Sequence, residues 1–596
     1  ESVMAKLRSE IDDKFKWAVN DIFATDEAWN DEYERCKGIL DTPSRYEGII
    51  GESASNLASE LKEEMDESFA CERLYVYAFM KYYEDTANPV YQAMSGKAQM
   101  LAMSLSEKYA YSEPKILAID KNKMDEYLAT PEIEPYRHLL EDMLSKREHS
   151  LSAAEEKLLA MSDQMSQAAS EIFSKFNNAD VRFGDIHDEN GESVELTHGT
   201  FGVYMESNNR EVRKEAFYAL YKQYKEHINT LASTYYANVC QAMFYARARK
   251  YPSTLNMYLS ASFIPESVYT NLCETVNKNL PKMHKYVSLR KKCLGVDELH
   301  FYDIYAPMVK DFKMEVSYEE AKQIALKALA PLGDEYLSKV QEGFDSGWVD
   351  VYENAGKRSG AFSWGVYGTH PYLFLNYNNT LNDVFTLVHE MGHSMHTYYS
   401  NKTQPFMYSG YKIFVAEVAS TCNEALLINY LLKNCTDENE RKYLINHYLE
   451  QFKGTLFRQT MFAEFEMESH KMAEAGEVLN AQNLCDLYRD LNEKYFGEDM
   501  VIDDEIAYEW SRIPHFYTPF YVYQYATGFS AAIAIATKIL AGDKEVLAGY
   551  KKFLSGGSSM HPIELLKLCG VDMSKPQVIQ DALDVFDKLL DEFTNE

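Results

Sequence analysis

The chain has 596 residues, of which 46% are hydrophobic, and this composition excludes a mainly disordered protein. It carries 60 Lys and Arg against 92 Asp and Glu, a formal net charge of −32. Because such a charge repels phosphate backbones and anionic lipid, we expect neither nucleic acid nor a membrane surface as a partner.

Three further features bear on the compartment. No apolar run approaches the ~20 residues that cross a bilayer, and the N-terminus has no apolar signal-type segment. The nine cysteines include no Cys-x-x-Cys pair, which is typical of buried thiols in a reducing environment. The sequence therefore predicts a cytoplasmic protein.

Helical patterns dominate the chain up to about residue 180. Ser152, followed three residues later by Glu155, predicts the start of one helix. Residues 181–202 have β-branched flanks around Asp-Glu-Asn-Gly and predict a β-hairpin. We place the main boundary there, between an N-terminal helical lobe at 1–190 and a second domain at 191–596.

A second irregular stretch covers residues 356–379, in which glycines alternate with aromatic residues. This pattern predicts a small sheet with a Gly-rich turn. It lies just before the segment that carries the strongest chemical signal.

That segment is an apolar helix with the sequence His389-Glu390-Met-Gly-His393. Residues four apart lie on the same side of a helix, so both imidazoles can reach one Zn²⁺. Glu390 lies one step round, where its carboxylate can take a proton from water at the metal. His396 is on the same stripe but about 10 Å from His389 along the axis, too far for the same ion. We expect it to pack or to support a ligand.

A third protein ligand is predicted at Glu417. Its neighbours Phe414, Val415, Ala416, Val418 and Ala419 are apolar, and a carboxylate in such a run is costly unless it is paired or metal-bound. A hairpin of two helices would bring Glu417 to the histidine pair. Glu424 lies two turns further on the same stripe and can orient a ligand or remain a surface carboxylate.

These segments resemble a known family. HEMGHSMHTYYSNKTQPF and FVAEVASTCNEALL resemble the oligoendopeptidase F branch of the thimet oligopeptidase (M3) zinc metallopeptidases. GAFSWGVYGTHPYLFLNY is similar to the family's edge strand and Gly-rich loop, and WSRIPHFYTPFYVYQYATG to its C-terminal His/Tyr motif.

The resemblance implies a mainly α, two-lobed body with a deep central channel and a small β-sheet near the zinc helix. It implies one Zn²⁺ per chain on His389, His393 and Glu417, with Glu390 as the base, and makes 191–596 the catalytic domain. His515 or a nearby tyrosine would donate to the oxyanion; Tyr523 is favoured, followed by Tyr521 and Tyr525.

Substrate contacts are predicted from the same resemblance. The strand around Tyr372 is expected to be an edge that pairs with the peptide backbone. Gly365 and Gly368 would allow close approach, and His396 is a further candidate contact.

The predicted function is zinc-dependent hydrolysis of internal bonds in short unstructured oligopeptides. A helical zinc carboxypeptidase and a non-catalytic peptide-binding protein are the alternatives. The sequence predicts no particular oligomeric state.

Overall fold

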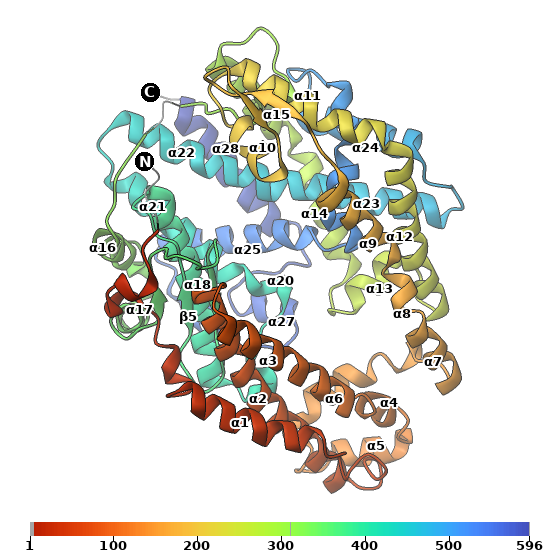
Figure 1. The fold of residues 1–596 in the computed structure, drawn as a ribbon. Helices are drawn as coiled ribbons and strands as arrows, with labels where there is room; N and C mark the ends of the chain where they lie inside the picture. The colour runs from red at the N-terminus through yellow and green to blue at the C-terminus, as the bar shows by residue number, and fades with distance from the viewer. Residues whose placement is uncertain (1–4, 310–311, 595–596) are drawn as a thin grey trace. The chain divides into compact units, whose positions relative to one another are not determined.

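The computed structural model describes residues 5–309 and 312–594, most of which lie in helices (Figure 1). The chain divides into two compact units, each made of three segments. Unit 1 comprises residues 1–148, 313–427 and 535–570; unit 2 comprises 149–312, 428–534 and 571–596. The mainly helical fold is thus confirmed, whereas the boundary after residue 190 and the central channel stay predictions.

Unit 1 begins with long helices that lie side by side (Figure 1). Each starts at a side-chain cap: Thr25 for α1, Ser53 for α2 and Asn88, followed by Pro89, for α3. The helices of this first segment are α1 (Asp26–Leu40), α2 (Ala54–Glu84), α3 (Pro89–Lys108), α4 (Ser112–Leu117), α5 (Lys121–Leu128) and α6 (Arg137–Leu144).

A three-stranded sheet lies in the second segment of unit 1, in the order β3-β5-β4. It follows α16 (Tyr318–Ala328) and α17 (Asp334–Asp345), and its strands are β3 (Val349–Asp350), β4 (Phe362–Trp364) and β5 (Tyr372–Phe374). β5 pairs parallel with β3 and antiparallel with β4, with Leu373 opposite both Val349 and Ser363. The small sheet predicted before the helix of His389 and His393 is confirmed.

The position of β5 corrects one prediction. Tyr372 begins the central strand, which is paired on both sides, so the expectation that this strand is a free edge is wrong. Its side chain is fully buried and its hydroxyl donates to the carbonyl of Ala18 at 2.8 Å. β3 and β4 are the edge strands of this sheet, and β4 contacts α18.

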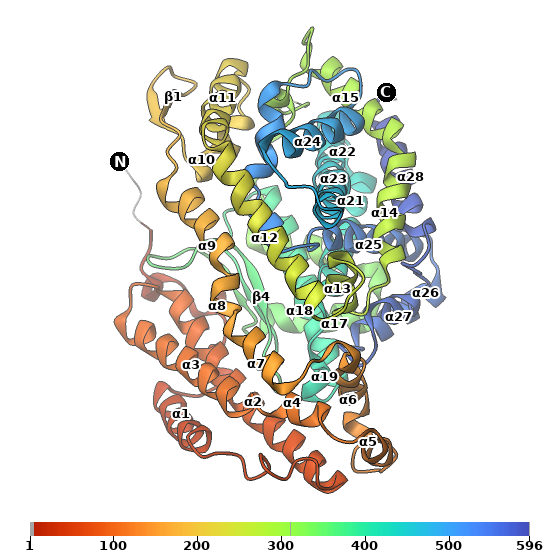
Figure 2. The ribbon, with the colours of Figure 1, turned by 90° about the vertical axis from the view of Figure 1, so that its right-hand side faces the viewer.

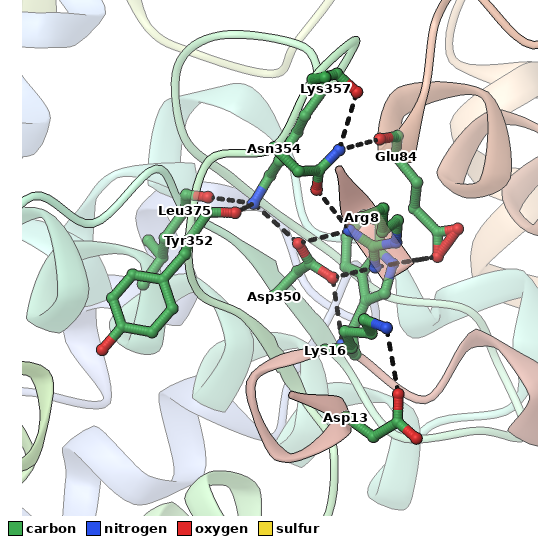
Figure 3. A network of polar contacts seen from close by, with 11 residues as sticks. Arg8, Asp13, Lys16, Glu84, Asp350, Tyr352, Asn354, Lys357 and Leu375 are labelled. Atoms are coloured by element: carbon green, nitrogen blue, oxygen red, sulfur yellow. Dashed lines mark hydrogen bonds and ion pairs between the residues drawn. The ribbon is translucent and has the colours of Figure 1, made fainter. Parts of the chain in front are cut away.

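A buried charge network joins the N-terminal segment to the sheet (Figure 3). Asp350, at the end of β3, accepts from Arg8 Nη1 at 3.2 Å and from Lys357 Nζ at 2.7 Å. Arg8 also pairs with Glu84 at 3.2 Å. Two cations thus face two carboxylates, and each buried charge has a partner of opposite sign within the protein.

The sheet is followed by α18 (Leu381–Thr403), which begins at a capping box between Thr380 and Asp383. Val384, Phe385, Leu387 and Val388 bury its first turns, as the apolar pattern predicts. The chain continues through α19 (Phe406–Ser409), α20 (Ile413–Ala416) and α21 (Val418–Asn434). After α25 (Tyr523–Leu540), unit 1 is completed by α26 (Lys544–Leu554) and α27 (Pro562–Lys567).

Unit 2 contains the predicted hairpin, in which β1 (Asp185–His187) pairs antiparallel with β2 (Ser193–Glu195). The rest is helical, and α14 and α28 lie side by side (Figure 2). Its other main helices are α7 (Ala153–Met161), α8 (Asp163–Ser166), α9 (Ala168–Lys175), α10 (His198–Met205), α11 (Arg210–Glu226), α12 (Ile228–Ala248), α13 (Thr254–Ser260), α14 (Glu266–Lys278), α15 (Leu280–Leu294), α22 (Glu438–Gln451), α23 (Arg458–Glu474), α24 (Ala481–Phe496) and α28 (Gln577–Thr594).

Candidate metal centre

Three side chains from unit 1 converge on one point. His389 and His393 lie one turn apart on α18, with ring centroids 4.9 Å apart. Glu417 Oε2 lies 3.5 Å from His389 Nε2 and 3.3 Å from His393 Nε2. All three ligand atoms lie within 4.8 Å of one another, so a single cation can contact all of them.

Glu417 does not lie inside a continuous helix. It follows Ala416, the last residue of α20, and precedes Val418, the first residue of α21. Ser420 Oγ donates to Glu417 Oε2 at 3.0 Å and so fixes the carboxylate that faces the two histidines. The break in the helix places this carboxylate, and the apolar pattern alone did not predict it.

Glu424 contacts the far side of the first histidine. Its Oε2 lies 3.1 Å from His389 Nδ1, which therefore donates its proton, and in the neutral imidazole this leaves the lone pair on Nε2. Glu424 thus contacts the predicted ligand His389, as one of the two possibilities for its position requires.

The electrostatics of the cluster favour positive charge at its centre. Burial lowers the pKa of His389, but the hydrogen bond to Glu424 and the neighbouring carboxylates raise it to about 9. Burial raises the pKa of Glu417, but the contacts with His393 and His389 lower it to about 2. Among the described residues, no Lys or Arg forms an ion pair with Glu417, Glu424 or Glu390. The donors therefore lack a protein cation.

Gly392 brings the two helices together. A Cβ at this position would lie 2.6 Å from the carbonyl oxygen of Ala419 and 2.7 Å from Ser420 Cα. Asn423 secures the same contact, since its side-chain amide donates to Val388 O at 3.0 Å. Sequence analysis did not assign a role to either residue, although a glycine inside a buried helix is a signal of close backbone approach.

Glu390 is buried next to the cluster, with 8% of its surface exposed. Burial raises the pKa of its carboxyl group, and the two histidines act in the opposite direction. Its position beside the converging donors suits a group that accepts and releases a proton.

The donor set fits a metal of the zinc type. Two imidazole nitrogens and one carboxylate oxygen are a common three-ligand set for Zn²⁺ that leaves a position open. His389 carries the carboxylate partner on its second nitrogen that metal-bound histidines usually have. These residues can therefore hold a divalent ion without rearranging the helices.

Three other predicted residues of unit 1 lie on α18 or in the loop between β4 and β5. A Cβ on Gly365 would lie 2.2 Å from Thr397 Cγ2, so this glycine allows the loop after β4 to contact the helix. Gly368 has a φ of +90°, a conformation that favours glycine. His396 is 1% exposed and stacks on Tyr411 at 3.7 Å, which is a packing role. Contacts of these residues with substrate stay predictions.

In unit 2, the C-terminal motif brings together His515, Tyr521 and Tyr525. The centroid of the His515 ring lies 6.2 Å from that of each tyrosine, and the two tyrosine rings are 5.5 Å apart. Tyr523 is only 3% exposed and its ring packs against Tyr269 at 4.9 Å. Tyr523 is thus part of the packed interior, whereas Tyr521 and Tyr525 lie beside His515; which tyrosine is catalytic stays a prediction.

A buried carboxyl group contacts the backbone of the residue that precedes Tyr521. Phe520 has a φ of +57°, which is unusual for a large side chain, and its N–H donates to Glu466 Oε2 at 2.8 Å. Glu466 is fully buried on α23. Its carboxylate thus supports the strained residue that precedes Tyr521, and no local sequence pattern revealed this contact.

Comparison with known proteins decides the family. Residues 203–585 match Peptidase family M3, and residues 115–183 match the family described as Oligopeptidase F. The chain belongs to peptidase family M3. It is 50% identical to Oligopeptidase PepF of Bacillus subtilis (strain 168), over 98% of this chain and 88% of that protein.

Two further relatives agree with this assignment. The chain is 42% identical to an Oligoendopeptidase F homolog of Lactococcus lactis subsp. lactis (strain IL1403), over 99% and 98% of the two chains. The crystal structure of oligoendopeptidase-F from Enterococcus faecium matches with a TM-score of 0.74 at 39% identity, covering 95% of this chain and 98% of that one.

The M3 peptidase is an endopeptidase of the oligoendopeptidase F type that acts on oligopeptides. This agrees with the predicted enzyme class and not with the carboxypeptidase or non-catalytic alternatives. Among the described helices, none combines the length and apolar character needed to span a membrane.

Proposed function

We propose that this M3 peptidase cleaves internal bonds of short oligopeptides with one catalytic Zn²⁺ held by His389, His393 and Glu417. The observation that carries the proposal is the convergence of both Nε2 atoms on Glu417 Oε2, at 3.5 and 3.3 Å. The lack of a Lys or Arg partner for this cluster, among the described residues, supports a metal as the missing positive charge.

In this proposal, Glu390 and Glu424 have separate roles beside the ion. When bound, Zn²⁺ supplies a Lewis acid and makes a water molecule at the site more acidic. Glu390 accepts the proton that the attacking water loses and delivers it to the departing amine nitrogen. After the new C–O bond has formed, the C–N bond breaks, and the products are a carboxylate and an ammonium group, which carries both protons of the water. Glu424 keeps His389 in the tautomer that ligation requires.

His515, with Tyr521 or Tyr525, is proposed as the source of the hydrogen bond to the oxyanion. One such donor is worth ~10²–10³ in rate. Tyr521→Phe and Tyr525→Phe should therefore lower kcat, whereas Tyr523→Phe should mainly affect stability. A kcat loss confined to Tyr523→Phe would instead support the sequence-based prediction that Tyr523 is the catalytic tyrosine.

The substrate class can be tested with a series of unstructured peptides of roughly 5 to 30 residues and one folded protein, with and without chelator. Products are identified by mass spectrometry. Internal cleavage of the peptides, lost with chelator and regained with Zn²⁺, is the expected result. Cleavage that persists after complete metal removal would exclude the zinc mechanism, and one-residue trimming would exclude the endopeptidase.

A cytoplasmic location is proposed from the acidic, cysteine-poor sequence. Separation of cell fractions, followed by detection of the native protein, tests it directly.

A further inference from the structure

A second cluster of metal-ligating side chains lies in unit 1, apart from the α18 residues. His138 and Asp142 are one turn apart on α6, and His561 precedes α27. His561 Nε2 lies 2.8 Å from Asp142 Oδ1, and His138 Nε2 lies 3.5 Å from Asp142 Oδ2. The three ligand atoms lie within 4.8 Å of one another.

The geometry points to a second Zn²⁺ site, and we propose that His138, Asp142 and His561 bind this ion. The donor set, two imidazoles and one carboxylate, has the same composition as the α18 cluster. The distances from imidazole nitrogen to carboxylate oxygen are also similar, at 2.8 and 3.5 Å here and 3.3 and 3.5 Å there. Imidazole with carboxylate suits Zn²⁺ better than the oxygen-binding ions Mg²⁺ and Ca²⁺.

The arrangement is specific because it joins distant parts of the chain. Asp142 and His561 are 419 positions apart, yet one carboxylate contacts both imidazoles through different oxygens. The ion pairs of Asp142 within the described residues involve these histidines and no Lys or Arg. The three side chains are 28–36% exposed, which leaves room for water as a further ligand.

The neighbouring contacts show what such an ion would hold together. The ring of His138 packs edge-on against Tyr408 at 5.7 Å. Tyr408 follows the end of α18, and its hydroxyl donates to Pro135 O at 3.0 Å and accepts from Leu139 N at 3.1 Å. Ser558 N in turn donates to Tyr408 O at 2.9 Å. Zn²⁺ here would fasten α6, the segment after α18 and the turn before α27 to one another.

The role is therefore structural and separate from peptide hydrolysis. An ion that binds only the folded protein stabilises it by mass action, so the melting temperature should rise with free Zn²⁺. Because the site joins three segments of unit 1, its loss should lower the melting temperature in zinc without removing the catalytic residues.

The test uses the full chain, stripped of metal and then dialysed against buffered Zn²⁺, with bound metal counted by mass spectrometry of the elements. We expect two equivalents in the wild type and one in His138→Ala, His561→Ala and Asp142→Asn. In a His389→Ala background, adding His138→Ala should remove the second-site equivalent that remains. This background separates failure of the second site from failure of the catalytic one.

His187→Ala is the matched control. His187 is an exposed histidine paired with Glu215 at 3.0 Å, and no third donor joins this pair in the metal-ligand clusters of the described residues. Its replacement should leave two equivalents bound. Asp142→Asn keeps the size of the side chain, so it reports on ligation even if the alanine variants fold poorly.

Absorption of Co²⁺-loaded protein gives a second readout. The His389→Ala protein should still show the visible bands of a histidine-bound Co²⁺ site, and these should vanish on adding His561→Ala. A His389→Ala protein that binds no zinc, or two equivalents that survive all three substitutions, would overturn the proposal. The cluster would then be an ordinary histidine–carboxylate hydrogen-bond pair.

Discussion

Two polar clusters of unit 1 differ in how their charges are compensated. In the network of Figure 3, Arg8 and Lys357 face Asp350 and Glu84, so the protein supplies both signs. In the α18 cluster, carboxylates face two histidines, and no Lys or Arg pairs with them among the described residues. The first network includes Asp350 at the end of β3, and the second begins on α18, the helix that follows the sheet in the sequence. Both clusters are polar and at least partly buried. They differ in that the carboxylates of the α18 cluster have no Lys or Arg partner in the part of the chain that the structure describes, and this lack of a protein cation distinguishes the cluster that we propose to bind zinc.

Glu390→Gln should give the largest effect on activity. The amide cannot accept the proton, and general-base catalysis contributes ~10²–10⁴ in rate. We expect kcat for a peptide to fall by about this factor while bound zinc is unchanged, since Glu390 is not a ligand. Glu335→Gln, at an exposed position on α17, is the control and should retain full activity. Near-normal turnover of Glu390→Gln would remove Glu390 from the mechanism.

Asp350→Ala should instead act on stability. Breaking a buried ion pair by removing one partner costs about 3–5 kcal/mol, because Lys357 loses its carboxylate partner and Arg8 keeps only Glu84. The free energy of unfolding, measured in urea, should fall by this amount, with zinc content per folded molecule unchanged. Loss of zinc at full stability would mean that the two clusters are not separate in function.

Gly392→Ala tests the contact between the helices that carry the metal donors. The added Cβ would lie 2.6 Å from the carbonyl oxygen of Ala419, so α21 must shift, at about 1–3 kcal/mol. Zinc affinity and stability should fall together. Gly96→Ala in α3 is the control, since a Cβ there meets nothing within 4 Å, and it should be neutral or slightly stabilising. Equal results for both variants would contradict the close approach.

Glu424→Gln should have the smallest effect. The amide oxygen can still accept from His389 Nδ1, but the negative charge is lost. Changes of this kind cost roughly 10- to 100-fold in metal affinity. Competition with a chelator of known affinity measures the change, and kcat at saturating zinc should remain close to the wild type. An unchanged affinity would show that Glu424 has no orienting role.

The convergence of His389, His393 and Glu417 was predictable because their relations are local. His389 and His393 are one helical turn apart, and the apolar neighbours of Glu417 made a lone carboxylate conspicuous. Gly392 escaped prediction because its role depends on which backbone packs against it. His561 escaped for the same reason, since its partner Asp142 is 419 positions away.

The fold was predictable in its helices and less so in its sheet. The expected edge strand at Tyr372 proved central because β3, only two residues long, gave no recognisable signal. The packing of the C-terminal tyrosines could not be predicted for a related reason. Tyr521 precedes the start of α25 at Tyr523, so helical periodicity could not tell which ring faces the core.

The most direct test of the account is a zinc titration of metal-free protein, following peptide cleavage, for the wild type and Glu417→Ala. Activity of the wild type should return with the tightest equivalent of zinc bound. Glu417→Ala should remain inactive at the same free zinc and lack that equivalent. Full recovery of Glu417→Ala at wild-type zinc concentrations would contradict the claim that the incompletely compensated cluster of α18 and Glu417 holds the catalytic ion.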